Sequence, residues 1–154
     1  MHIDWTGSVA VVTGAGSGIG RGIALACNVA RRDEVDAAVA AARSAFPAWR
    51  ASSLSRRAEI MFTFRGLVVQ HRDEIAELVS IEHGKVPSDA AGELARGIEN
   101  IEFACGIPAL MKGGYSEGVS GGVDVYSIKQ PLGVVAGITP FNFPAMVPMW
   151  MYPV

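Results

Sequence analysis

The sequence predicts an α/β fold in which four amphipathic helices are followed by a β-hairpin arm and the first strand of a parallel sheet. Three observations lead to it. Apolar residues recur at helical spacing through the middle of the chain, a strand-like run ends in a proline-glycine turn near position 130, and a glycine-rich turn lies near the N-terminus. The 154 residues, 50% of them apolar, are enough for one ordinary domain with its own core.

The N-terminal segment reads as a strand, a glycine-rich turn and a helix. Val9–Val12 is a compact apolar strand, and a helical run is expected from Arg21 to about Cys27. Between them, Gly14, Gly18 and Gly20 let the backbone approach a ligand, and the free N–H groups at a helix start suit a pyrophosphate. The alternative is a β-α piece that packs and binds nothing.

The wording Thr-Gly-x-x-x-Gly-Ile-Gly resembles the short-chain dehydrogenase/reductase family, in which this turn binds NAD(P). That resemblance implies a tyrosine with a lysine four residues later, yet Tyr126 is followed at that distance by Gln130, and Lys129 stands one residue too early. A dinucleotide fold also needs a second strand ending in an acidic residue, whereas Asp33 and Glu34 open a helix. The segment therefore has a phosphate turn without the chemistry of that family.

Four helices are expected between Arg31 and Pro108, because apolar residues recur there at intervals of three and four. Asp33 and Glu34 lie in the first turn of the first helix, where negative charge complements the helix dipole. The expected boundaries are Pro47 and Trp49 at the end of the first helix, Gly84 at the end of the third, Ser88 as the N-cap of the fourth, and Gly106 with Pro108 at its end.

The stretch after these helices carries the candidate chemistry. A strand-like run, Val123–Lys129, is broken by a Pro-Leu-Gly turn, and Val134–Ile138 then reads as an apolar strand buried on both faces. Asn142 stands just beyond the carboxyl end of that strand, where α/β proteins place site residues, and its side-chain amide can donate to an oxyanion. The alternative is that Asn142 caps a helix beginning near Pro144.

The segment Pro-Leu-Gly-Val-Val…Thr-Pro-Phe-Asn-Phe-Pro resembles a signature of the aldehyde dehydrogenase superfamily. With the residues that follow it, it is most similar to the CoA-acylating, methylmalonate-semialdehyde branch, and the wordings Glu-His-Gly-Lys and Arg-Gly-Ile-Glu-Asn-Ile-Glu match as well. The resemblance runs from about Val29 to Val154. It implies a truncated aldehyde-dehydrogenase-like domain over residues 28–154, ending in the first strand of a Rossmann-type sheet, joined as a chimera to the short-chain-dehydrogenase-like residues 1–27.

The resemblance also implies roles for individual residues. In the superfamily, the amide at the position of Asn142 stabilises the oxyanion of a thiohemiacetal formed at a cysteine. The backbone at Thr139, Pro140 and Phe141 would lie beside the nicotinamide ring of NAD. CoA would be the co-substrate that releases the acyl group.

Arg96 has two interpretations. By resemblance, it would hold the distal carboxylate of a semialdehyde, for which a planar guanidinium is suited by its two parallel hydrogen bonds. From spacing alone, it is an exposed helix arginine that pairs weakly with Glu93 or Glu99.

The remaining candidates are expected to be structural. Cys105 falls on an apolar helix stripe and reads as a small buried hydrophobe, and Lys85 is isolated and expected to be solvated. Cys27 and Cys105 are the only cysteines of the printed sequence, and their spacing suggests neither a disulfide framework nor a metal site. A net charge of −2 without a basic cluster argues against nucleic acid, and four prolines from Pro140 onward argue against a membrane span.

The sequence therefore predicts a cytoplasmic fragment of an NAD-dependent, CoA-acylating aldehyde dehydrogenase that oxidises malonate or methylmalonate semialdehyde to an acyl-CoA. The superfamily's nucleophilic cysteine and glutamate base lie downstream of the Asn142 segment, so no turnover is expected from this chain alone. Two alternatives stay open. One is an NAD(P)-binding remnant of a short-chain dehydrogenase. The other is a non-catalytic fragment that self-associates or inserts into full-length aldehyde dehydrogenase oligomers through a hairpin over Val123–Thr139.

Overall fold

Two units make up the chain in the computed structural model, which describes residues 8–13, 23–28 and 31–154. Unit 1 comprises Met1–Ser52 with Pro131–Ala136, and unit 2 comprises Ser53–Gln130 with Gly137–Val154. The predicted boundary between residues 27 and 28 concerns the origin of the sequence and stays a prediction.

Unit 1 contains a two-stranded sheet and one long helix. Strand β1 (Ser8–Thr13) pairs antiparallel with β2 (Ile23–Asn28), in a register that sets Ser8 opposite Asn28. The helix predicted over residues 21–27 is therefore wrong where the structure describes it, and so is the β-α unit. A run of five apolar residues is too short for its periodicity to separate strand from helix, and pairing with β1 satisfies backbone groups that so short a helix leaves open. Gly14, Gly18 and Gly20 lie outside the described residues.

Helix α1 (Arg32–Ala51) begins as predicted, and Arg31 forms an ion pair with Asp33 at 2.7 Å in its first turn. Its end was predicted too early, since Pro47 lies inside the helix. An interior proline removes one backbone hydrogen bond and crowds the carbonyl four residues earlier, yet this helix continues past Pro47 to Ala51.

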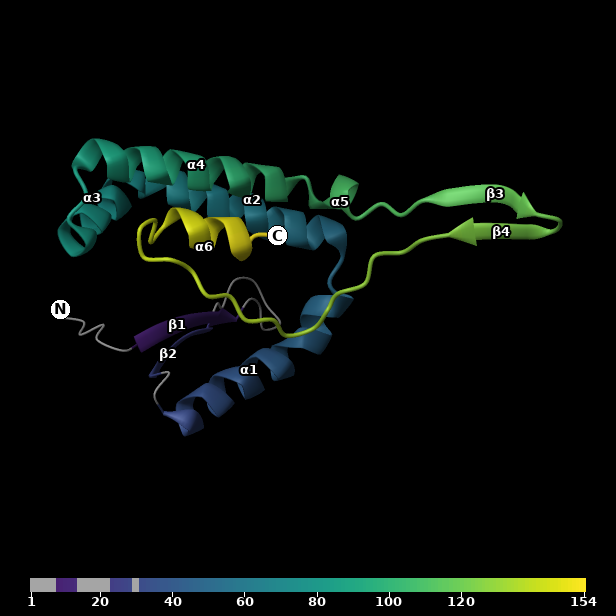
Figure 1. Ribbon diagram of the computed structural model, residues 1–154, viewed down its shortest axis with the longest axis horizontal. Helices are drawn as coiled ribbons and strands as arrows, with labels where there is room; N and C mark the ends of the chain where they lie inside the picture. Colours follow the sequence, from purple (N-terminus) through teal and green to yellow (C-terminus); the bar gives the residue numbers. More distant parts are fainter. Residues whose placement is uncertain (1–7, 14–22, 29–30) are drawn as a thin grey trace. The chain divides into compact units, whose positions relative to one another are not determined.

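Unit 2 is built around α4 (Pro87–Cys105), which packs against α2 (Leu54–Gln70), α3 (Arg72–His83) and α6 (Met146–Met151), as Figure 1 shows. A short turn, α5 (Ile107–Leu110), follows it.

The predicted ends of α3 at Gly84 and of α4 at Gly106 are confirmed. Ser53 caps α2 by accepting the N–H of Arg56 at 3.1 Å, and Gly84 ends α3 with a φ of +83° that favours glycine. Ser88 was a wrong choice of cap, because α4 begins one residue earlier with Pro87 in its first turn.

Small side chains form much of the core of unit 2. On α4, Ala90, Leu94, Ile101 and Ala104 are at most 2% exposed. Alanine and glycine on this face let the neighbouring helices approach α4 closely, so the core depends on tight packing. One cluster joins α3 and α4 through Ala76, Val79, Ala90 and Leu94, with Ile75, Ala145 and Met149 packed against it.

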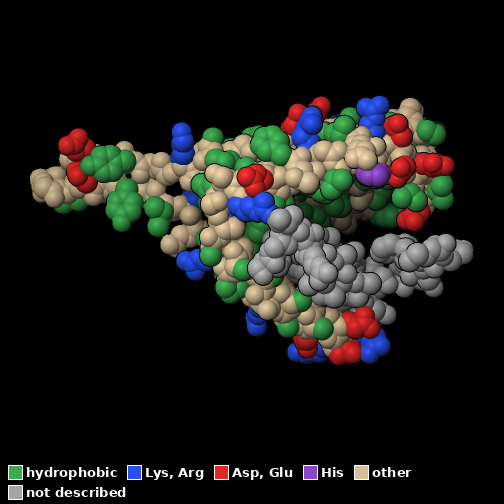
Figure 2. Space-filling view, turned by 180° about the vertical axis from the view of Figure 1, so that it is seen from behind, with side chains coloured by type: hydrophobic (Ala, Val, Ile, Leu, Met, Phe, Trp, Pro, Cys, Tyr) green, Lys and Arg blue, Asp and Glu red, His purple; other side chains and the backbone are tan. Residues whose placement is uncertain are grey.

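A β-hairpin extends from the helices of unit 2 (Figure 1). It comprises β3 (Tyr115–Ser120) and β4 (Val123–Tyr126), which pair antiparallel and are exposed along their whole length. The predicted hairpin arm is present, but it precedes the proline-glycine turn and does not span Val123–Thr139. Figure 2 shows hydrophobic side chains along this arm. Tyr115 of β3 and Tyr126 of β4 are 64% and 73% exposed.

The predicted strand Val134–Ile138 does not form. Val135 and Ile138 are 73% and 95% exposed, and the strands among the described residues form two antiparallel pairs. A central strand needs neighbours on both sides for its backbone hydrogen bonds, and the described residues supply none here. The prediction of a buried Rossmann-type strand is therefore wrong for this chain.

Among the helices of the described ranges, none is long and apolar enough to cross a membrane.

Candidate functional site

The segment 139–145, here called the site loop, carries most of the predicted site residues. Asn142 is exposed, between an exposed Phe141 and a half-buried Phe143. The helix after it begins at Met146, with Ala145 as its N-cap and no side-chain cap. The alternative that Asn142 caps this helix is therefore wrong.

Glu93 of α4 holds the end of the site loop. Its Oε1 accepts the backbone N–H of Ala145 at 2.7 Å and of Met146 at 2.9 Å, and its Oε2 accepts a hydrogen bond from Lys85 Nζ at 2.5 Å. The residue is 1% exposed. Burial alone would raise the pKa of this carboxyl, but the bonds from Lys85, Met146 and Ala145 outweigh it and lower the pKa below 4.5.

Lys85 reaches the loop from the residue after the helix-ending Gly84. Its side chain is 13% exposed, and its Nζ lies 4.0 Å from the centre of the Phe143 ring. A cation over an aromatic face is attracted by the ring's quadrupole, and more strongly when desolvated. The prediction that Lys85 is solvated is wrong, because the chain turns at Gly84 and brings the ammonium group under the site loop.

A third contact holds the loop on its N-terminal side. The ring of His83, the last residue of α3, packs on Phe141 with centroids 4.9 Å apart and an angle of 43° between the planes. Phe141 and Phe143, the two neighbours of Asn142, are thus both held by residues at the end of α3.

The helix after the loop is fixed to α4 by a further amide. Asn100 Nδ2 donates to the carbonyl of Met149 at 2.9 Å, and Gly97 leaves room for the Met149 side chain against α4. Met146 is 3% exposed and lies in the core, whereas Trp150 is 46% exposed.

Arg96 lies on the exposed face of α4. It borders a hollow of about 400 Å³ whose other lining residues are Glu99, Asn100, Phe103 and Trp150. No site-loop residue lines this hollow, so the structure does not bring Arg96 and Asn142 together in one pocket.

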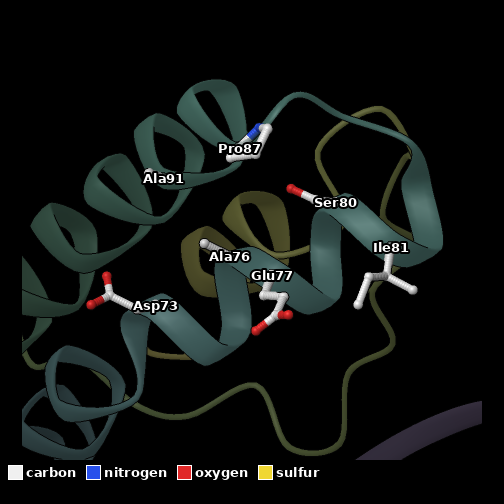
Figure 3. Close-up of a pocket in the computed structure, with 7 residues that line it drawn as sticks. All are labelled: Asp73, Ala76, Glu77, Ser80, Ile81, Pro87 and Ala91. Atoms are coloured by element: carbon white, nitrogen blue, oxygen red, sulfur yellow. The ribbon is translucent and has the colours of Figure 1, made fainter.

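A second hollow, of about 470 Å³, lies between α3 and α4 (Figure 3). It contains no predicted site residue. Its lining residues are Asp73, Ala76, Glu77, Ser80, Ile81, Pro87 and Ala91.

Cys105 is 6% exposed at the end of α4. Burial raises the pKa of its thiol, so the sulfur stays protonated at neutral pH. The prediction of a small buried hydrophobe is confirmed.

Over the described ranges, no three His, Cys, Asp or Glu side chains are grouped to hold a metal ion.

Sequence reasoning missed Glu93 and Lys85 as supports of the site loop. A signal was present for Glu93, since it lies on the stripe of α4 that also carries Ala90, Leu94 and Gly97. A carboxylate on a stripe of small apolar residues is expected to be buried and paired. Its partner could not be read from spacing, because Lys85 lies on a different element.

Comparison with known proteins identifies relatives over nearly all of the chain. A model of the aldehyde dehydrogenase family matches residues 9–154. This match begins upstream of Val29, where the sequence resemblance was expected to start, and includes part of the segment that resembled another family.

Malonate- and methylmalonate-semialdehyde dehydrogenases are among the similar proteins. Malonate-semialdehyde dehydrogenase of Pseudomonas aeruginosa is 57% identical over 116 residues, which are 75% of this chain and 23% of the relative. The crystal structure of methylmalonate-semialdehyde dehydrogenase from Oceanimonas doudoroffii superposes with a TM-score of 0.77 at 50% identity, covering 99% of this chain and 30% of that one. A protein of Sinorhizobium meliloti 1021, assigned as a methylmalonate-semialdehyde dehydrogenase and solved in complex with NAD, gives a TM-score of 0.75 at 48% identity, covering 79% of this chain and 25% of that one. The chain spans about a quarter of the length of the curated relatives it matches.

Proposed function

The chain belongs to the aldehyde dehydrogenase family, and from that premise we propose that it supplies the oxyanion-binding part of a CoA-acylating semialdehyde dehydrogenase. The substrate would be malonate or methylmalonate semialdehyde, the oxidant NAD and the acyl acceptor CoA. The relatives' names support this choice. The observation that carries the proposal is an exposed Asn142 amide on a loop whose flanking residues are held by Glu93, Lys85 and His83.

Asn142 would act when a cysteine thiolate attacks the aldehyde carbon. The carbonyl oxygen then becomes an alkoxide, and a side-chain N–H already in place stabilises that charge without reorganisation. A loop fixed on both sides of the donor meets this requirement better than a free one. Cys105 is unsuited as the nucleophile because it is buried and its thiol pKa is raised. We therefore propose that this chain alone does not turn over the semialdehyde.

The backbone of Thr139, Pro140 and Phe141 is the proposed contact for the nicotinamide end of NAD. The described residues fit this part of the cofactor, since Phe141 and Ile138 are 67% and 95% exposed and offer an apolar surface to a planar ring. NAD, when bound, supplies the hydride acceptor. The chain's own contribution would be to orient the ring and to exclude water from it.

Arg96 is the proposed ligand of the substrate's distal carboxylate. Arg96 lines a hollow that the site loop does not line, so the proposal rests on the family resemblance of its helix segment and on the ability of a guanidinium to hold a carboxylate by two hydrogen bonds.

A hybrid enzyme tests these roles directly. Residues 31–154 replace the matching segment of the Oceanimonas doudoroffii enzyme, and Asn142→Ala is then introduced. Loss of one oxyanion donor should lower kcat by about 10²–10³ with little change in KM. Gln130→Ala, which removes an exposed amide outside the site loop, is the matched control. An Asn142→Ala hybrid with the parent kcat would refute the role of Asn142.

Arg96→Leu in the same hybrid separates substrate binding from chemistry. It should raise KM for malonate semialdehyde and leave KM for propanal, which has no carboxylate, unchanged. Equal changes for both aldehydes would show that Arg96 does not recognise the acid group.

The isolated chain gives two further tests. Mixed with malonate semialdehyde, NAD and CoA, it should form NADH at the background rate, and a higher rate would contradict the proposal. Titrations followed by NADH and NADPH fluorescence test the alternative of an NAD(P)-binding remnant around Gly14, Gly18 and Gly20. Saturable binding that Gly18→Ala abolishes would support that alternative.

One observation favours a second function, which is insertion into full-length relatives. The β3–β4 hairpin is exposed on both strands and carries apolar side chains. Size-exclusion chromatography with the Pseudomonas aeruginosa enzyme tests this, since an inserted chain elutes with the larger protein. Elution of the chain at its own position would count against it.

A further inference from the structure

We infer that Glu93 is a positioning residue for Asn142, acting through the backbone of the site loop together with Lys85. The inference rests on the proposed role of Asn142 and adds the residues that aim it. Neither Glu93 nor Lys85 is expected to touch the substrate.

The first support is where the carboxylate binds. One oxygen of Glu93 accepts the N–H groups of Ala145 and Met146, which lie at the junction of the site loop and α6. Helix α6 has six residues and no side-chain cap of its own, so it is too short to be stable alone. Glu93 supplies from α4 the acceptor that the helix start lacks. The junction three residues after Asn142 is thereby fixed to the core of unit 2.

The second support is the other carboxylate oxygen. It holds Lys85, whose ammonium group lies 4.0 Å from the centre of the Phe143 ring. Phe143 is the next residue after Asn142. The same carboxylate therefore restrains the chain at two points, directly through the two amides and indirectly through the lysine and the aromatic ring.

The third support is the energetics of a buried ion pair. The side chain of Glu93 is 0% exposed and that of Lys85 is 13% exposed, so both charges lose most of their hydration. Well-packed apolar residues often stabilise a core at least as well as such a pair. A buried pair has one property that apolar packing lacks, since its hydrogen bonds are directional and select a single backbone arrangement. Here that arrangement leaves the Asn142 side chain exposed between two restrained aromatic residues.

Amide hydrogen exchange and ¹⁵N relaxation of the 154-residue chain test the inference without turnover. In Glu93→Ala, the exchange rates of Ala145 and Met146 should rise by about tenfold to a hundredfold relative to the Ile101 amide of α4, as expected for loss of a bond to a charged acceptor. The order parameter of the Asn142 amides should fall. The control is Glu102→Ala, which removes from α4 an exposed carboxylate that pairs with Arg65 of α2. It should change neither reading.

Two gentler variants cover the case in which Glu93→Ala does not fold. Glu93→Gln keeps an oxygen for the two amides and loses the charge, so Ala145 and Met146 should stay protected while Asn142 becomes more mobile. Lys85→Met keeps the side-chain length and should likewise mobilise Asn142 with the two amides protected.

The inference is overturned if Asn142 keeps its order in the variants that fold, or if Glu102→Ala loosens the loop equally. Because these readings involve no substrate, a hybrid enzyme that is indifferent to Asn142→Ala would refute the oxyanion role and leave the positioning result standing. Unchanged loop order in the Glu93 variants, together with a large kcat loss for Asn142→Ala in the hybrid, would refute the positioning role and support the oxyanion role.

Discussion

The two ends of α4 carry the same kind of interaction in opposite surroundings. Near its start, Glu93 pairs with Lys85, and their side chains are 0% and 13% exposed. Near its end, Glu102 pairs with Arg65 at 2.8 Å, and their side chains are 53% and 35% exposed. Both pairs have short N···O distances, yet only the buried carboxylate also accepts two backbone amides. The difference shows that burial and the number of donors, more than the distance between charges, decide which pair shapes the chain around it.

The largest effect should come from removing the buried carboxylate. Glu93→Ala leaves Lys85 and two amides without their acceptor in a dry site, and we expect a loss of about 3–5 kcal/mol in the free energy of unfolding. Urea denaturation followed by circular dichroism measures it. A loss no larger than that of Glu102→Ala would remove the distinction between the two ends.

Acid should act on the buried end through the same charge. The pKa of Glu93 is lowered below 4.5 on folding, mainly because the bonds from Lys85 and the two amides outweigh the opposing effect of burial. A lowered folded-state pKa contributes stability that is complete above the unfolded pKa and is lost as the pH falls through the folded one. The urea midpoint should thus be nearly constant from neutral pH to about pH 5 and decline below it.

The variant Glu93→Gln isolates this contribution. The stability of this variant should decline less in acid than that of the natural chain, because it lacks the Glu93 carboxyl. Some decline should remain, because the lowered pKa values of Asp33 and Asp124 are present in both proteins. Parallel declines in the two proteins would show that Glu93 does not titrate in this range.

The middle of α4 offers a matched pair of glycines. A Cβ at Gly97 would lie 3.2 Å from the Cβ of Met149 and closer still to its sulfur, whereas a Cβ at Gly92 meets nothing within 4 Å. Gly97→Ala should cost about 1–3 kcal/mol through overpacking against α6, and Gly92→Ala should gain about 0.5–1 kcal/mol through helix propensity. Thermal unfolding of both variants checks the signs. Equal stabilisation would mean that α6 shifts freely along α4.

The smallest effect is expected at the exposed end. Glu102→Ala should lower the free energy of unfolding by at most about 1 kcal/mol, and the difference should shrink further in high salt because exposed charges are screened. Denaturation at low and high ionic strength measures it. A larger loss that is insensitive to salt would place this pair with the buried one.

The sequence predicted those features that local rules decide. Gly84 marks the end of α3 because a left-handed φ is a local requirement that favours glycine. The burial of Cys105 followed from its place on an apolar stripe. Features decided by distant partners were not predicted. Ile23–Asn28 is a strand because β1 pairs with it, and Val134–Ile138 is not one because none of the residues that the structure describes pairs with it.

The candidate site divides in the same way. Asn142 and the loop around it were predicted from the order of residues and from a family resemblance, and the role of Asn142 stays a prediction. The supporting carboxylate is that of Glu93 on α4, which lies 52 residues before Ala145, whose N–H it accepts. The ammonium group is that of Lys85, which follows α3 and lies 8 residues before Glu93. Periodicity within one element cannot predict contacts between different elements. The support of the site loop by Glu93 and Lys85 therefore follows only from the packing of the helices.

Asp124 gives the β3–β4 hairpin a means of keeping its form without a neighbour. Its two oxygens accept the N–H of Gly118 at 2.9 Å and the hydroxyl of Tyr115 at 2.8 Å, across the two strands. Because these hydrogen bonds already order the hairpin, it would lose little conformational entropy on binding another surface. A surface that bound this arm would have to fit the conformation that the free hairpin already has.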